Sequence, residues 1–203
     1  MPTQNKHYKQ HTRRFRKSET AFINTLFRLL RRYRGKLTVA TVARELHMSR
    51  QAFYLHHHDI NTAITESEEL LLTEFSEFLA ARCPKNSGQR NNRQLITACF
   101  LFMSQRRIVF QEIGENMIHQ HILYRMLEIV YPKLVIVCLP AGTPAPALGS
   151  ERADLYLRYA VGVLSRWASA SRCDIGSAER YIRLLLKLAD EIGSRRYYSN
   201  PKN

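Results

Sequence analysis

The chain has 203 residues, of which 45% are hydrophobic, and its formal net charge is +14. This length and composition suit a globular protein with a buried core, and they exclude a chain that is disordered throughout. Residues 1–60 carry 13 Lys and Arg against 3 Asp and Glu, whereas residues 61–203 carry 18 against 14. A basic excess gathered in one part of the chain favours an anionic partner, nucleic acid above all, over a merely solubilising surface.

The residue pattern indicates an all-α fold, because helix formers are abundant, glycine is scarce and no alternation typical of strands is sustained. Residues 1–17 are polar and basic, so we expect a flexible basic arm there and no signal peptide. No apolar run is long enough for a membrane span, which favours a cytoplasmic protein. The cysteines are widely spaced and form no CxxC pair, so we expect reduced thiols. They are Cys83, Cys99, Cys138 and Cys173.

The elements expected in chain order begin with three helices in the N-terminal part. The first is expected between Ser18 and Gly35. Thr38 is predicted to cap a short second helix, and Ser49 a third that ends near His57. These three helices form the first predicted folded domain.

The rest of the chain is expected to form a larger helical body. Asp59 is placed to cap a long helix over residues 60–81. Pro132 is expected to kink or end a later helix, and residues 140–150, rich in Pro and Gly, are expected to form a loop. The other predicted helices cover residues 93–105, 108–113, 116–131, 151–170 and 177–195, and the tail from Tyr197 is expected to fray.

The most informative pattern lies in residues 37–60. Its apolar positions are spaced to pack two short helices across a tight turn, as in a helix-turn-helix: Val42, Ala43, Leu46, Met48 and Phe53. The second of these helices then presents five residues outward, namely Arg50, Gln51, Ala52, Tyr54 and Leu55. Since a recognition helix reads bases through residues near its N-terminus, the pattern predicts a DNA-reading helix.

The outward residues have the chemistry of DNA contacts. Arg50 suits a bidentate contact with guanine, and Gln51 suits one with adenine. The hydroxyl of Tyr54 can donate to a phosphate oxygen, which positions a protein without reading sequence.

The same segment resembles a known family. The residues Thr38, Val42-Ala43, Leu46, Met48-Ser49-Arg50, Phe53-Tyr54 and His56 follow the pattern T-x-x-x-[IV]-A-x-x-[AL]-G-[VM]-S-x-x-[TA]-[FL]-Y-x-[HY]-F. Over about residues 18–62 the chain therefore resembles the TetR family of bacterial regulators. The resemblance implies a DNA-binding domain over residues 18–60, and a divergent regulatory and dimerisation domain over residues 61–203. The expected DNA-contacting residues are Thr38, Ser49, Arg50, Gln51, Ala52, Tyr54, Leu55, His56 and His58.

Three residues depart from the family pattern. His47 stands where the family usually has glycine, and a left-handed turn conformation there costs about 1 kcal/mol. His57 stands at a usually aromatic position, so we expect a partly buried packing residue. Ile60 replaces a lysine that often contacts phosphate, which removes one expected contact; the basic arm and His58 could compensate. No metal site is expected at residues 56–59, because consecutive helical residues point about 100° apart.

The last two predicted helices resemble the pair that forms the dimer interface in that family, on Gly162, Trp167 and Ser177-Ala178-Glu179. The resemblance implies a homodimer, which a palindromic operator requires. The predicted interface residues are Leu157, Val161, Gly162, Leu164, Ala168, Ile182, Leu185 and Leu186. The alternative is that these apolar stripes only pack the core of one protomer.

A pocket for a small-molecule effector of unknown identity is the remaining candidate site. Its predicted walls are Phe100, Met103, Phe110, Met117, Tyr124 and Tyr156, although such residues at helical spacing are more often plain core. We expect a ligand-responsive regulator of transcription, more often a repressor than an activator by family analogy. In the alternative, the helical body binds a protein partner. No enzyme motif is present and no cofactor is expected.

Overall fold

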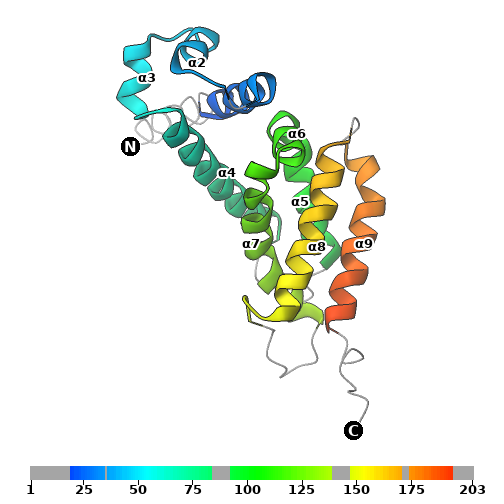
Figure 1. The fold of residues 1–203 in the computed structure, drawn as a ribbon. Helices are drawn as coiled ribbons and strands as arrows, with labels where there is room; N and C mark the ends of the chain where they lie inside the picture. The colour runs from blue at the N-terminus through cyan, green and yellow to red at the C-terminus, as the bar shows by residue number, and fades with distance from the viewer. Residues whose placement is uncertain (1–18, 35, 84–91, 139–146, 171–173, 194–203) are drawn as a thin grey trace, which may run out of the picture. The chain divides into compact units, whose positions relative to one another are not determined.

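The computed structural model describes residues 19–34, 36–83, 92–138, 147–170 and 174–193. All regular elements in these ranges are helices, so the predicted all-α fold is confirmed (Figure 1). The chain divides into two compact units, Met1–Glu69 and Leu70–Asn203, which are described separately. No helix in the described ranges is both long and apolar enough to cross a bilayer.

The first unit contains a helix over residues 19–33, called the first helix below, followed by α2 (Val39–Glu45), α3 (Arg50–His56) and the beginning of α4 (Ile60–Arg82). Apolar residues at three- and four-residue spacing in the first helix are buried, as its periodicity predicts. The core of this unit comprises Ile23, Leu26, Phe27, Leu29, Leu30, Val42, Ala43, Phe53 and Ala63.

Helix α4 begins where the sequence places its cap. The Thr62 N–H donates to Oδ1 of Asp59 at 2.7 Å, and this hydrogen bond is the main reason why the pKa of Asp59 is lowered. The helix ends at Arg82, one residue beyond the predicted end. Its first turns belong to the first unit, because Ala63 is fully buried in that unit's core. The division between the units therefore falls inside α4 rather than in front of it.

The second unit is a bundle of α5 (Asn92–Gln105), α6 (Arg107–Glu115), a 3-10 turn η1 (Met117–His119), α7 (His121–Cys138), α8 (Glu151–Ala168) and α9 (Ile175–Gly193). Helix α8 packs against α6, α7 and α9, and α5 packs against α9 (Figure 1). Aromatic rings fill its centre: Phe102 meets Phe75 edge-on at 5.1 Å between centroids, and Phe100 meets Trp167 at 4.9 Å.

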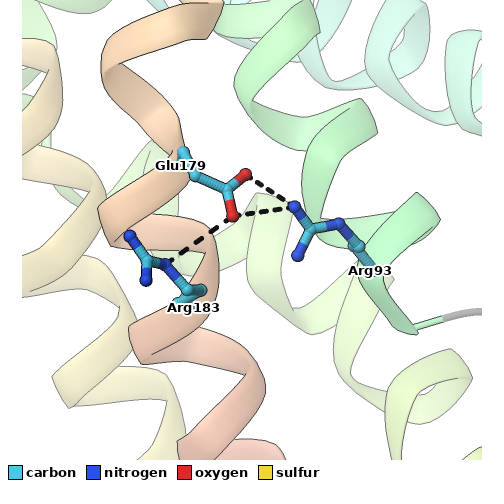
Figure 2. A network of polar contacts seen from close by, with 3 residues as sticks. All are labelled: Arg93, Glu179 and Arg183. Carbon is cyan, nitrogen blue, oxygen red and sulfur yellow. Dashed lines mark hydrogen bonds and ion pairs between the residues drawn. The ribbon is translucent and has the colours of Figure 1, made fainter.

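An ion-pair network joins α5 to α9 on the surface of this bundle. Nη2 of Arg93 donates to both carboxylate oxygens of Glu179, at 2.8 and 2.6 Å, and Nε of Arg183 lies 3.6 Å from the same carboxylate (Figure 2). The hydrogen bond from Arg93 is the main cause that lowers the pKa of Glu179. The network fixes the two helices to each other with charge-assisted hydrogen bonds.

The region around Pro132 differs from the prediction. The expected single helix over residues 116–131 is divided into η1 and α7, because the Asn116 side chain caps η1 by accepting from the Ile118 N–H at 3.1 Å. Pro132 does not end α7, which continues to Cys138. Proline removes one backbone hydrogen bond, and the burial of Tyr131 and Leu134 on either side of it favours the continued helix.

The structure also describes the start of α8 and two of the cysteines. The Ser150 hydroxyl caps α8 by accepting from the Ala153 N–H at 3.3 Å. Neither Cys83 nor Cys99 forms a disulfide, and burial raises the pKa of Cys99 to about 12. The expected arm over residues 1–17, most of the loop over residues 140–150, the tail from Tyr197 and the side chains of Cys138 and Cys173 lie outside the described residues.

Candidate nucleic-acid interface

Helix α2 is built around a capping residue and two buried side chains. Thr38 is its N-cap and accepts the Thr41 N–H through Oγ1 at 3.3 Å. Val42 and Ala43 are buried, so they attach the helix to the core of the first unit. Thr38 itself is exposed, and its hydroxyl is also 3.0 Å from that of Thr41.

The turn after α2 confirms the expected left-handed residue. His47 has φ +53°, which glycine adopts more easily than histidine. The Met48 N–H donates to the carbonyl of Ala43 at 2.9 Å, and the His47 N–H donates to that of Arg44 at 3.2 Å. These two bonds form a Schellman motif, which satisfies carbonyls that the end of a helix leaves free. The tight turn therefore forms with histidine where glycine is usual.

Helix α3 follows at once and shows one buried side chain. Ser49 caps it by accepting the Ala52 N–H at 3.0 Å. Phe53 is fully buried and fixes the helix to the core. Four of the five residues predicted to face outward are exposed, namely Arg50, Gln51, Tyr54 (57%) and Leu55 (78%), whereas Ala52 is half-buried. The side chains that could touch a partner are thus free of the core.

The electrostatics of α2 and α3 favour an anionic partner. Neither helix has an acidic residue in its first turn. The carboxylate Glu45, at the end of α2, lies 3.3 Å from Nη2 of Arg28 in the first helix. Lys36, which precedes α2, and Arg44, in the last turn of α2, are exposed cations that the sequence interpretation did not single out. Their charge was the available signal, but nothing in the sequence alone separates such cations from a solvated surface.

The three consecutive histidines lie in different surroundings. His56 is exposed, and His58 is 90% exposed, with Nδ1 3.5 Å from Oδ2 of Asp59. His57 is only 17% exposed at its side chain, and its ring stacks on that of Phe22 with centroids 4.7 Å apart. His57 is therefore the partly buried packing residue that was predicted. No group of three or more metal-ligating residues that could hold an ion occurs in the described ranges.

Two features near α3 bear on the predicted contacts. Ile60 opens α4 and is half-buried, so position 60 supplies no cation for a phosphate. Nδ1 of His57 lies 2.5 Å from Oε2 of Glu66 in α4. The sequence interpretation missed Glu66, because the two residues are nine positions apart and meet only once α3 and α4 are placed.

The predicted effector pocket is not assembled as expected. Four of its six wall residues are core side chains with almost no exposed surface: Phe100, Met103, Phe110 and Tyr156. Tyr156 packs on the Tyr131 ring, with centroids 5.4 Å apart. Met117, in contrast, is 82% exposed and Tyr124 is half-buried. The six residues thus do not enclose one cavity, as helical spacing alone does not distinguish a pocket wall from a packed core.

The predicted dimer interface needs a similar correction. Five of its eight residues are buried inside the second unit: Leu157, Leu164, Ala168, Ile182 and Leu185. They pack the core of one protomer and cannot reach a second copy. Val161 and Leu186 are half-buried, and Gly162 is exposed. The apolar side chains that α8 and α9 do expose are Leu155, Tyr159, Ile175 and Leu184.

An open hollow lies over the outer face of α8. Its volume is about 600 Å³ and it is lined by Gln120, Arg158, Val161, Gly162, Ser165, Arg166, Ser169, Ala170 and Tyr181. A Cβ built on Gly162 would meet nothing within 4 Å, so this glycine leaves space at the surface. Nε of Arg158 is already 2.6 Å from Oδ2 of Asp154.

No protein-family model matches the chain, and no curated protein is significantly similar to it in sequence. The class that the fold defines is therefore an all-helical protein with two compact units.

Proposed function

We propose that the protein is a sequence-specific regulator of transcription that binds double-stranded DNA through α2 and α3 as a helix-turn-helix. The observation that carries the proposal is the exposure pattern of α3, in which Phe53 is fully buried while Arg50, Gln51, Tyr54 and Leu55 are exposed. Ser49 caps the start of α3 by accepting the Ala52 N–H, and Arg50 and Gln51 in its first turn are exposed. The basic N-terminal sequence adds the electrostatic attraction that DNA binding needs.

In this proposal the residues of α3 divide by role. Arg50 and Gln51 read base edges in the major groove, while Ala52 and Leu55 offer apolar contact to a thymine methyl group. Tyr54, His56 and His58 hold phosphates, together with the hydroxyls of Thr38 and Ser49 where their capping bonds allow. Phosphate contacts position the protein and base contacts specify the site, so the two groups should respond differently to mutation.

The proposed regulator acts in the cytoplasm as a homodimer on a palindromic operator. Two recognition helices about 34 Å apart are needed to read such a site. The side chains available for the contact are apolar ones that α8 and α9 leave exposed, Leu155, Tyr159 and Leu184, and Gly162 leaves space three residues beyond Tyr159 on α8. By family analogy the regulator is a repressor that releases its operator when a small molecule binds to the second unit.

Selection of bound sequences from a random DNA library, followed by footprinting, tests the proposal. The expected result is a palindromic motif whose protected half-sites lie one helical turn apart, with affinity falling steeply as salt is raised. Recovery of no motif, or of DNA bound equally at every sequence, would refute sequence-specific regulation. The variant Arg50→Ala serves as the matched control, because Arg50 is exposed and its loss should leave the fold intact.

A second candidate is a regulator whose helical body binds a protein partner instead of a small molecule. The observation in its favour is η1, where the large apolar side chains Met117 and Ile118 are both exposed. Exposed apolar residues that are adjacent on the surface are a feature of protein-binding sites. Two experiments separate the candidates. A rise in melting temperature with a member of a metabolite library supports a small-molecule effector. Capture of a protein by the wild type but not by Met117→Ser supports a protein partner.

A further inference from the structure

The hollow over the outer face of α8 has a positively charged lining. The lining includes Arg158 and Arg166, and none of the lining residues that the structure describes is an aspartate or a glutamate. Its volume of about 600 Å³ lies within the range of about 300–1,000 Å³ that is typical of small-molecule sites. Since a surface of one sign attracts ligands of the opposite sign, the lining favours an anionic ligand.

Both guanidinium groups have hydrogen-bonding capacity left for such a ligand. Arg158 donates to Oδ2 of Asp154 through Nε at 2.6 Å. An arginine carries five N–H donors, so the Nη groups at the tip of Arg158 remain available for a second acceptor. Arg166 is exposed and forms no ion pair with any residue in the described part of the chain. The fold thus leaves the charge of Arg166 without a counter-ion there.

The polar side chains of the lining are held in place by hydrogen bonds. Nε2 of Gln120 donates to Oγ of Ser165 at 3.1 Å, and Ser165 in turn donates to the Gly114 carbonyl at 2.9 Å. Because Ser165 is buried, this chain of bonds fixes the Gln120 side chain in the lining. The amide of Gln120 carries a second N–H, which adds a neutral donor to the two cationic ones. The lining is therefore organised before any ligand arrives.

The rest of the lining gives room for an apolar group. Val161 is half-buried, and Gly162 leaves open space, because a Cβ built on it would meet nothing within 4 Å. Tyr181 of α9 adds an aromatic ring, and its hydroxyl accepts from Nη2 of Arg180 at 3.0 Å. A hydroxyl that accepts can still donate its own proton, so Tyr181 supplies both an apolar surface and a donor. A ligand that matches this lining has an acidic group and an apolar part.

We propose that the hollow over α8 binds a small organic acid with a flat apolar body. The acid group pairs with Arg166, and Arg158, about two turns earlier in α8, adds further N–H donors. The body of the ligand lies over Gly162, where the surface leaves space. This inference deepens the proposed function and rests on it for its consequence, since the bound acid is then the effector that releases the operator. Binding of the acid itself needs no DNA.

Isothermal titration calorimetry of the whole chain tests the site with 2-naphthoate, and with 2-naphthamide as a neutral ligand of nearly the same shape. Naphthoate should bind about tenfold more tightly than naphthamide, because hydrogen bonds to charged groups are the stronger ones. Arg166→Gln should remove this preference. Lys187→Gln is the matched control, since it removes an exposed cation of α9 outside the lining, and it should keep the wild-type affinity. Equal naphthoate affinity for the wild type and Arg166→Gln, or no binding to the wild type, would overturn the proposal.

Two substitutions at one position test where the ligand lies. Gly162→Leu fills the open space without entering the core, so naphthoate affinity should fall by about tenfold while the melting temperature stays near that of the wild type. Gly162→Ala adds a single methyl group and should bind naphthoate within about twofold of the wild type. Wild-type affinity in Gly162→Leu would show that the ligand binds elsewhere, and the proposal would fail.

Sedimentation velocity and operator binding separate this proposal from its alternatives. If Arg166→Gln changes the oligomeric state but not the affinity for naphthoate, a second copy of the chain occupies the hollow and the proposal is wrong. A protein that binds its operator but no naphthoate loses the acid site alone. A protein that binds naphthoate with the expected dependence on Arg166, but no specific DNA, supports the acid site and refutes the proposed function.

Discussion

Replacing His47 by glycine should stabilise the turn between α2 and α3. His47 has φ +53°, and this conformation costs a residue with a side chain about 1–2 kcal/mol. Glycine avoids that strain but loses about 0.5–1 kcal/mol more through the entropy of the unfolded chain. The imidazole is exposed, so removing it sacrifices little packing. The expected net gain is about 0.5–1 kcal/mol in the local free energy of opening.

Hydrogen exchange at the Met48 amide measures this gain directly, because that N–H donates to the Ala43 carbonyl across the turn. Exchange should slow by about two- to fivefold in His47→Gly. The control His58→Gly removes the same side chain from an exposed position without positive φ, and should not slow exchange. Unchanged or faster exchange in His47→Gly would refute the assignment of strain to this residue.

Three further predictions concern other parts of the molecule. Gly114→Ala should lower the free energy of unfolding by about 1–3 kcal/mol, because the new Cβ would lie 2.9 Å from the Ser165 carbonyl oxygen and from the Ala168 Cβ. Gly162→Ala should leave that free energy unchanged or raise it, because nothing lies within 4 Å of its Cβ. Melting temperatures followed by Trp167 fluorescence compare the two variants. Arg50→Ala should lower affinity for the selected operator by about 1–3 kcal/mol and relax one base position, while Tyr54→Phe should weaken all sites alike in the same binding assay. The lowered pKa of Glu179 means that its bond to Arg93 stabilises the fold above the unfolded-state pKa and is lost as pH falls through the folded-state pKa. Glu179→Gln should therefore flatten the acid side of a stability–pH curve, and an unchanged curve would contradict that reading.

The sequence predicts the helix caps well because a cap is a local event. Thr38, Ser49 and Asp59 each accept an N–H three residues ahead, so a short polar side chain followed by a helical pattern contains the whole interaction. The left-handed turn at His47 is expected from the family resemblance, because the family usually has glycine at that position. These local features define the elements of the candidate interface before any tertiary contact is known.

The partner of His57 depends on tertiary placement instead. The sequence predicts partial burial at position 57 from the aromatic pattern, and this is confirmed. Which polar group would meet the ring was open, because α4 carries several carboxylates and only its rotation selects Glu66. The continuation of α7 past Pro132 is a similar case, since burial on both sides of the proline outweighs a local preference to end the helix.

The outer face of α8 shows why apolar spacing alone misassigns an interface. Two stripes on this helix have helical spacing. One is buried in the bundle and includes Leu157 and Leu164, and the other is exposed and includes Leu155, Tyr159 and Gly162. The buried stripe is the more apolar of the two in the sequence, and for that reason the interface was predicted there. The most apolar face of a helix packs into the core of its own protomer, so a dimer contact can use only a face that stays exposed. Mutations that test dimerisation therefore belong at Leu155 and Tyr159, because changes at Leu157 or Leu164 would unfold the protomer and give the same loss of dimer for a different reason.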